Sequence, residues 1–105
     1  MVDQDTIDKM VELLHAAASP RKIVLFGSYA TGQADDDSDI DLLVVESGTP
    51  DIVAEMVRLR RTLSPLRVPV DLVVVSEDHY EYWLDTPGNL MFEVATDGKV
   101  LYEAA

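Results

Sequence analysis

The 105-residue chain contains no cysteine, which excludes disulfide-stabilised scaffolds, cysteine zinc sites and thiol catalysis. Long apolar runs are also absent, since Ile23–Phe26, Leu42–Val45 and Leu72–Val75 hold only four residues each. A membrane-spanning helix needs about 20. The first ten residues are acidic and lack the basic-then-apolar order of a signal peptide. We therefore expect a cytoplasmic protein with no membrane contact.

Basic residues are scarce: eight lysines and arginines face 20 aspartates and glutamates, for a net charge of −12. Sequence-independent nucleic-acid binding needs cationic side chains that neutralise phosphates, so we expect no direct nucleic-acid binding. The acidic excess either steers a basic partner or is an adaptation to high salt. Arg58, Arg60, Arg61 and Arg67 form the one basic cluster, which is either a solvated helix face or a local positive patch.

The length and the apolar pattern predict one domain over residues 1–105, of the α/β (α+β) class with one small sheet. With 48% hydrophobic residues the chain can form a small core. The expected helices cover residues 3–18, 29–31, 51–63, 77–84 and 86–96, and the expected strands cover residues 22–26, 39–45, 68–75 and 99–102.

Proline positions set three of the expected helix boundaries. Ser19-Pro20 and Ser64-Pro65 are expected to end the first two long helices, because the residue before proline is disfavoured in the helical region. Thr86-Pro87 resembles an N-cap followed by proline at the first helical position, so we expect the last helix to begin there.

Two aspartates open the second expected strand. Because side chains alternate across a strand, Asp39 and Asp41 should share one face while Ile40 points into the core. Two adjacent carboxylates on an apolar strand repel each other, and one would protonate unless a cation joined them. Mg²⁺ suits this arrangement, because it takes hard oxygen ligands and often binds carboxylates together with substrate phosphates.

Asp71 repeats this feature in the third expected strand, between Val70 and Leu72. If that strand lies beside the second, Asp71 completes a triad, with roles in metal ligation and as a general base. The alternative is that the three aspartates face solvent at a sheet edge. The apolar side chains beside each of them favour the triad.

Gly27-Ser28 follows the first expected strand, where a short helix begins. Backbone N–H groups at such a point bind phosphate, glycine permits close approach, and the serine hydroxyl adds a donor. An ordinary strand-to-helix turn is the alternative. A P-loop is excluded, because Gln33 and Ala34 follow the second glycine in place of lysine and serine or threonine.

The joint pattern is Gly27-Ser28, ten intervening residues, Asp39-Ile40-Asp41 and then Asp71. It resembles the DNA polymerase beta-like nucleotidyltransferase superfamily, and within it the minimal nucleotidyltransferase (MNT) family, over essentially the whole length. The resemblance implies a small mixed sheet with helices packed mainly on one face. It also implies that Asp39, Asp41 and Asp71 hold two Mg²⁺ ions and that Gly27 and Ser28 contact the triphosphate.

The reaction implied is attack of a hydroxyl on the α-phosphorus of ATP, with release of pyrophosphate. Proteins of this kind commonly pair with a HEPN-domain toxin and transfer AMP to one of its tyrosines, which makes the MNT protein an antitoxin. The sequence leaves the choice between a homo-oligomer and a hetero-oligomer open. One departure from the family pattern is Thr31, where a basic residue often precedes the second glycine. Arg58–Arg61 is the candidate substitute for that missing charge.

Two other functions stay open at the level of sequence. The protein could neutralise its partner by contact alone, without catalysis. It could also be one subunit of a small-molecule nucleotidyltransferase, such as an antibiotic-modifying enzyme completed by a separate helical chain.

Overall fold

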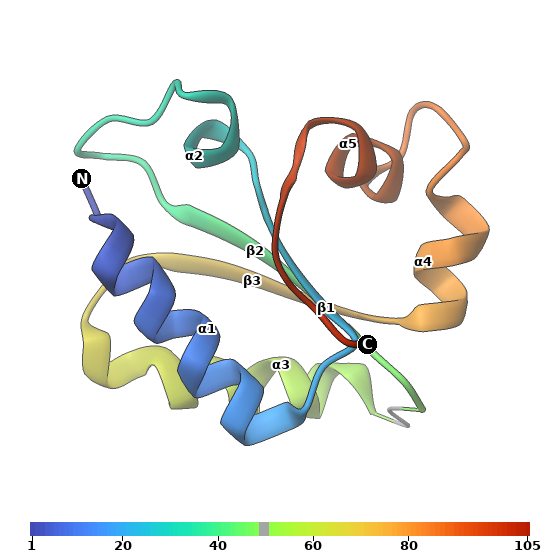
Figure 1. Cartoon of the computed structure of the whole chain (residues 1–105), viewed down its shortest axis with the longest axis horizontal. Coiled ribbons are helices and arrows are strands. Elements are labelled where there is room, and N and C mark those ends of the chain that lie inside the picture. Colours follow the sequence, from blue (N-terminus) through green and yellow to red (C-terminus); the bar gives the residue numbers. More distant parts are fainter. Residues whose placement is uncertain (49–50) are drawn as a thin grey trace.

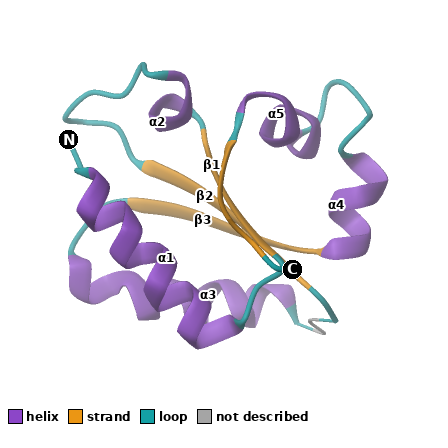
Figure 2. Ribbon diagram, in the orientation of Figure 1, coloured by secondary structure: helices purple, strands orange, loops and turns teal. Residues whose placement is uncertain are grey.

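The computed structural model describes residues 1–48 and 51–105 (Figures 1 and 2). The elements are α1 (Gln4–Ala18), β1 (Lys22–Phe26), α2 (Ser28–Thr31), β2 (Ile40–Glu46), α3 (Ile52–Leu63), the 3₁₀ turn η1 (Ser64–Leu66), β3 (Val70–Ser76), α4 (Glu77–Trp83), α5 (Leu90–Asp97) and β4 (Lys99–Glu103). No helix in these two ranges has the length and apolarity that a membrane crossing requires.

The four strands form one mixed sheet in the order β3-β2-β1-β4. β1 runs antiparallel to both of its neighbours, β2 and β4, whereas β2 and β3 run parallel. The parallel pair is joined through α3, as a parallel connection requires a crossover. The predicted α/β class and the small mixed sheet are confirmed.

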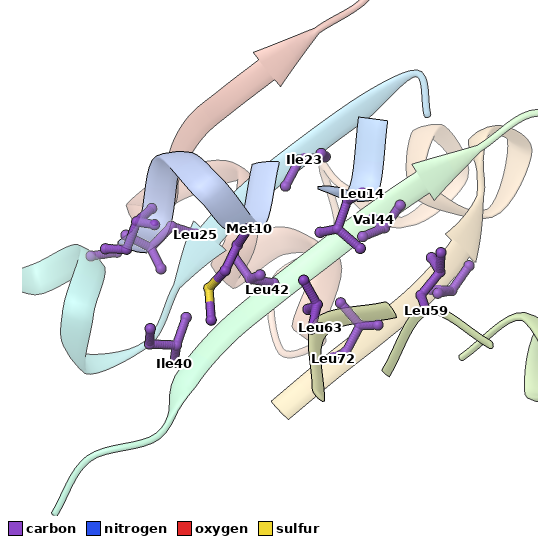
Figure 3. Packing of buried hydrophobic residues seen from close by; sticks show 13 residues of the cluster. Met10, Leu14, Ile23, Leu25, Ile40, Leu42, Val44, Leu59, Leu63 and Leu72 are labelled. Atoms are coloured by element: carbon purple, nitrogen blue, oxygen red, sulfur yellow. The ribbon is translucent and has the colours of Figure 1, made fainter. Parts of the chain in front are cut away.

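Strand alternation divides the core into two clusters. On one face of the sheet, Leu42 and Val44 pack beneath the long helices α1 and α3 (Figures 1 and 3). On the other face, Leu43 and Val45 pack with the shorter helices α4 and α5. The two longest helices thus share one face and the shorter two cover part of the opposite face, whereas the resemblance implied helices mainly on one face. The labelled residues of the first cluster are Met10, Leu14, Ile23, Leu25, Ile40, Leu42, Val44, Leu59, Leu63 and Leu72.

Of the three helix boundaries predicted from proline, two are confirmed and one is wrong. α1 ends at Ala18 and α3 ends at Leu63, as predicted, and after α3 the chain continues through Pro65 as the 3₁₀ turn η1. Proline at the start of a 3₁₀ turn loses no hydrogen bond, because its missing N–H would be unsatisfied there anyway. The last helix begins after Asn89, not at Thr86, because the Asn89 side chain caps it.

Candidate active site

Asp41 and Asp71 lie side by side at one end of the sheet. The parallel strands β2 and β3 are in register, so that Asp41 is the direct Cα partner of Asp71. Their neighbours Leu42 and Leu72 are also partners and are fully buried, which places both aspartates on the face opposite α1 and α3. The expectation that the third strand lies beside the second is confirmed.

Asp39 precedes β2 and is exposed. Ile40, the next residue, is fully buried in the cluster beneath α1. The predicted alternation, with Ile40 in the core, is therefore observed at the start of this strand. Asp39 also contributes to the electrostatics of Asp41, as the pKa of that residue shows.

The pKa of Asp41 is raised above its ordinary value. Partial burial is the largest cause, and the negative charges of Asp71, Asp39 and Glu93 follow in that order. The charged form of Asp41 is thus disfavoured by loss of water and by three other carboxylates. A bound cation would offset this penalty, since it supplies a favourable partner for the charged form of Asp41.

Glu93 is a fourth carboxylate at this site that the sequence did not reveal. It lies in the first turn of α5, which packs against β1 through Met91 and Val94. The sequence carries no strand-aspartate pattern around Glu93, and the expected helix of residues 86–96 placed it mid-helix. Only the packing of α5 over the sheet brings its charge toward Asp41.

Gly27 fits closely against Asp41. Phe26, at the end of β1, is the Cα partner of Asp41, so the next residue turns directly over that side chain. Gly27 has φ 69° and ψ −151°, a conformation that essentially only glycine adopts. A Cβ at this position would overlap Asp41 Oδ2 and would lie 3.1 Å from its Cγ. The glycine-serine bend and the carboxylates therefore form one site, with Ser28 opening α2 beside it.

Of the predicted basic cluster, Arg60 reaches the site and Arg58 does not. Arg60 Nη2 lies 3.8 Å from Asp71 Oδ1. Arg58 donates two hydrogen bonds of 2.7 Å to the Glu55 carboxylate and one of 3.0 Å to the Ala17 carbonyl. Arg58 thus joins α3 to the end of α1. Of these two arginines, Arg60 is the one that places a positive charge beside the carboxylates.

The model of the family described as Polymerase beta, Nucleotidyltransferase matches residues 8–105 of the chain. The chain belongs to this family. It is therefore a nucleotidyltransferase, and the resemblance inferred from Gly27-Ser28 and the aspartates is confirmed.

Individual relatives of this nucleotidyltransferase agree with the assignment. The Methanocaldococcus jannaschii protein named "Putative protein adenylyltransferase MJ0604" is 31% identical over 104 residues, which cover 97% of this chain and 100% of that protein. A crystal structure of a toxin-antitoxin with AMP-PNP matches with a TM-score of 0.66 and 28% identity, over 98% of this chain and 75% of the other. The structure of the tri-AMPylated Shewanella oneidensis HEPN toxin in complex with MNT antitoxin matches with a TM-score of 0.62 and 28% identity. The match covers 96% of this chain and 72% of the other.

The donor set of this nucleotidyltransferase fits a hard divalent cation. Asp41 and Asp71 lie on one face of two adjacent strands, beside a glycine whose missing side chain makes room for Asp41 Oδ2. Within residues 1–48 and 51–105, no three potential ligand side chains converge closely enough to form a ready metal-binding group. The donors that the strand register does bring together are two, Asp41 and Asp71, and Mg²⁺ is often held by one or two carboxylates with substrate phosphates.

Proposed function

We propose that this nucleotidyltransferase transfers AMP from ATP to a hydroxyl group of a partner protein. The observation that carries the proposal is the register of Asp41 with Asp71 beside Gly27. Two comparisons support AMP as the transferred group. One relative is named as a protein adenylyltransferase, and the chain is similar to structures that contain AMP-PNP or an AMPylated toxin.

In this proposal Asp39, Asp41 and Asp71 hold two Mg²⁺ ions, and Gly27 and Ser28 contact the triphosphate. When bound, the ions would stabilise the entering and leaving oxygens. Gly27 lets a phosphate approach the backbone N–H groups at the start of α2, and the Ser28 hydroxyl adds a donor.

The acceptor hydroxyl oxygen attacks the α-phosphorus of ATP. A new oxygen–phosphorus bond forms as the bond to the bridging oxygen of pyrophosphate breaks, and pyrophosphate leaves with that electron pair. The proton of the acceptor hydroxyl passes to a carboxylate, a role that we assign to Asp71. Its side chain is 59% exposed and is thus open to an incoming group.

The acceptor we propose is a tyrosine of a HEPN-domain toxin, which makes this protein the antitoxin of the pair. The S. oneidensis complex contains an AMPylated HEPN toxin and an MNT antitoxin, and 96% of this chain matches there. We propose the cytoplasm as the location, where ATP is abundant.

The test is transfer of label from α-labelled ATP, with Mg²⁺, to the protein encoded by the neighbouring gene. We expect label on a tyrosine of that protein. Asp39→Asn together with Asp41→Asn should abolish labelling, because the cation site loses two of its carboxylates. Asp37→Asn, in the exposed loop before β2, is the matched control and should retain it. Label on a different acceptor alone would reject the HEPN tyrosine.

Contact without catalysis is the second candidate, and the same double variant separates the two. Thr31, where a basic residue often stands in the family, is the observation that favours it. If AMP transfer is the mechanism, the protein with Asp39→Asn and Asp41→Asn binds the toxin but no longer neutralises it. Neutralisation that survives the double substitution would assign the antitoxin effect to contact alone.

A further inference from the structure

Arg60 contacts the carboxylate site from the opposite side of the sheet. Its helix α3 packs through Leu59 and Leu63 on the face away from Asp41 and Asp71. β3 is an edge strand, so the Arg60 side chain reaches Asp71 around that edge, with 3.8 Å between Nη2 and Oδ1. A positive charge therefore stands beside one of the three proposed metal ligands.

The surroundings of Arg60 explain how its side chain is held there. It lines a surface hollow together with Leu63, Val68 and Val70, whose apolar side chains can support the aliphatic part of the arginine. The last turn of α3 also favours cations, because the helix C-terminus carries partial negative charge. Arg61 shares that turn, but the ion pair with Asp71 in the described residues comes from Arg60.

We propose that Arg60 is a built-in counter-ion of Asp71, which competes with the divalent cation for that carboxylate. This inference rests on the proposed function of the triad. In the metal-free protein, the guanidinium offsets part of the repulsion between Asp71 and Asp41. Cation binding requires Asp71 to exchange one positive partner for another.

The exposure of the pair makes such an exchange feasible. The side chains of Arg60 and Asp71 are 55% and 59% exposed, and exposed ion pairs are weak because water and salt screen them. The guanidinium can therefore leave Asp71 at little cost. Because like charges repel, the arginine nevertheless lowers the affinity of the site for a cation that arrives without the negative charge of a nucleotide.

The experiment is a Mn²⁺ titration of the metal-free protein without nucleotide, followed by the EPR signal of free Mn²⁺. We expect Arg60→Gln to tighten Mn²⁺ binding by about threefold or more, because a nearby positive charge is removed. Arg61→Gln is the matched control, since it removes the same charge from the same helical turn, and it should change the affinity by less than about twofold. Arg60→Lys keeps the charge and should bind like the unaltered protein.

A double-mutant cycle with Asp71→Asn separates contact from a general effect of net charge. In the Asp71→Asn background, Arg60→Gln should no longer tighten Mn²⁺ binding. An equal effect of Arg60→Gln and Arg61→Gln, or no effect of either, overturns the inference and leaves the proposed function standing. If the unaltered protein shows no Mn²⁺ binding that depends on Asp39 and Asp41, both are overturned.

Discussion

At the scale of single residues, two constraints require glycine at position 27: its backbone conformation and its closeness to Asp41. Gly27→Ala must adopt a conformation that L-residues avoid, and its Cβ meets the Asp41 carboxylate. We expect a loss of about 2 kcal/mol or more in the free energy of unfolding, together with a loss of nucleotide binding. Denaturant unfolding and nucleotide titration measure the two effects.

Gly32→Ala is the matched control for this prediction. Gly32 also has positive φ (79°), but a Cβ there meets nothing within 4 Å. Gly32→Ala should lower the free energy of unfolding by about 1 kcal/mol, through backbone strain alone, and should leave nucleotide binding intact. Equal effects of the two substitutions on binding would show that the closeness of Gly27 to Asp41 has no role in the site.

We expect the stability of the protein to depend on pH because of Glu46. It is buried at the end of β2, and its Oε2 atom finds no hydrogen-bond partner among residues 1–48 and 51–105. Burial and the neighbouring Glu55 carboxylate raise the pKa of Glu46 to about 7. The folded state thus holds a proton that the unfolded state has released, since the ordinary value is 4.5. The free energy of unfolding should therefore fall as pH rises from about 4.5 to about 7.

Glu46→Gln should reduce this slope, which is at most about 1.4 kcal/mol per pH unit for one proton. Part of the slope remains, because the pKa of Asp41 is also raised. Glu55 does not cancel it, since hydrogen bonding to Arg58 lowers the pKa of Glu55 and keeps it charged in this range. Glu12→Gln, at an exposed position, is the control. Urea unfolding at several pH values measures the slope, and an unchanged slope in Glu46→Gln contradicts the assignment.

At the scale of elements, the start of α5 determines where Glu93 lies. The Asn89 side chain accepts hydrogen bonds from the N–H groups of Met91 (2.8 Å) and Phe92 (3.2 Å). Asn89→Ala should therefore cost about 1 kcal/mol of stability. Thr86→Ala should cost little, because the recorded hydrogen bonds of Thr86 use its backbone: its N–H donates to the Trp83 carbonyl (3.2 Å) and its carbonyl accepts from Asn89. If Thr86→Ala proves the more destabilising in chemical denaturation, the cap assignment is wrong.

The strands could be predicted from sequence to within two residues, because short β-branched runs stand between turn residues. β1 is observed as predicted at Lys22–Phe26, and β3 begins at Val70, after Pro69. Helix starts were harder, since Thr86-Pro87 and Asn89 both carry capping signals and only side-chain geometry decides between them. Ser64-Pro65 ends α3 as predicted, and the 3₁₀ turn that follows was not predicted, because its geometry tolerates proline.

At the scale of the whole molecule, the site joins segments that are far apart in sequence. The meeting of Asp41 with Asp71 could be predicted, because an aspartate within an apolar strand is unusual and parallel pairing then brings the two strands together. The place of Glu93 could not be predicted, because it depends on how α5 packs on the sheet. The sequence indicated the range Arg58–Arg61, but the packing of α3 decides that Arg60 is the one that reaches Asp71. Local sequence patterns carry no information on how a helix packs on the sheet, so residues placed by that packing are seen only in the structure.

The central claim is that the carboxylates of Asp39, just before β2, of Asp41 in β2 and of Asp71 in β3 share divalent cations beside the glycine-serine bend. A crystal structure with Mn²⁺ and a non-hydrolysable ATP analogue, read by anomalous scattering, tests it most directly. The account predicts metal density about 2.1 Å from oxygens of Asp39, Asp41 and Asp71, with phosphates against Gly27 and Ser28. Nucleotide and metal bound elsewhere on the molecule, or a site that stays empty at saturating concentrations of both, would contradict it.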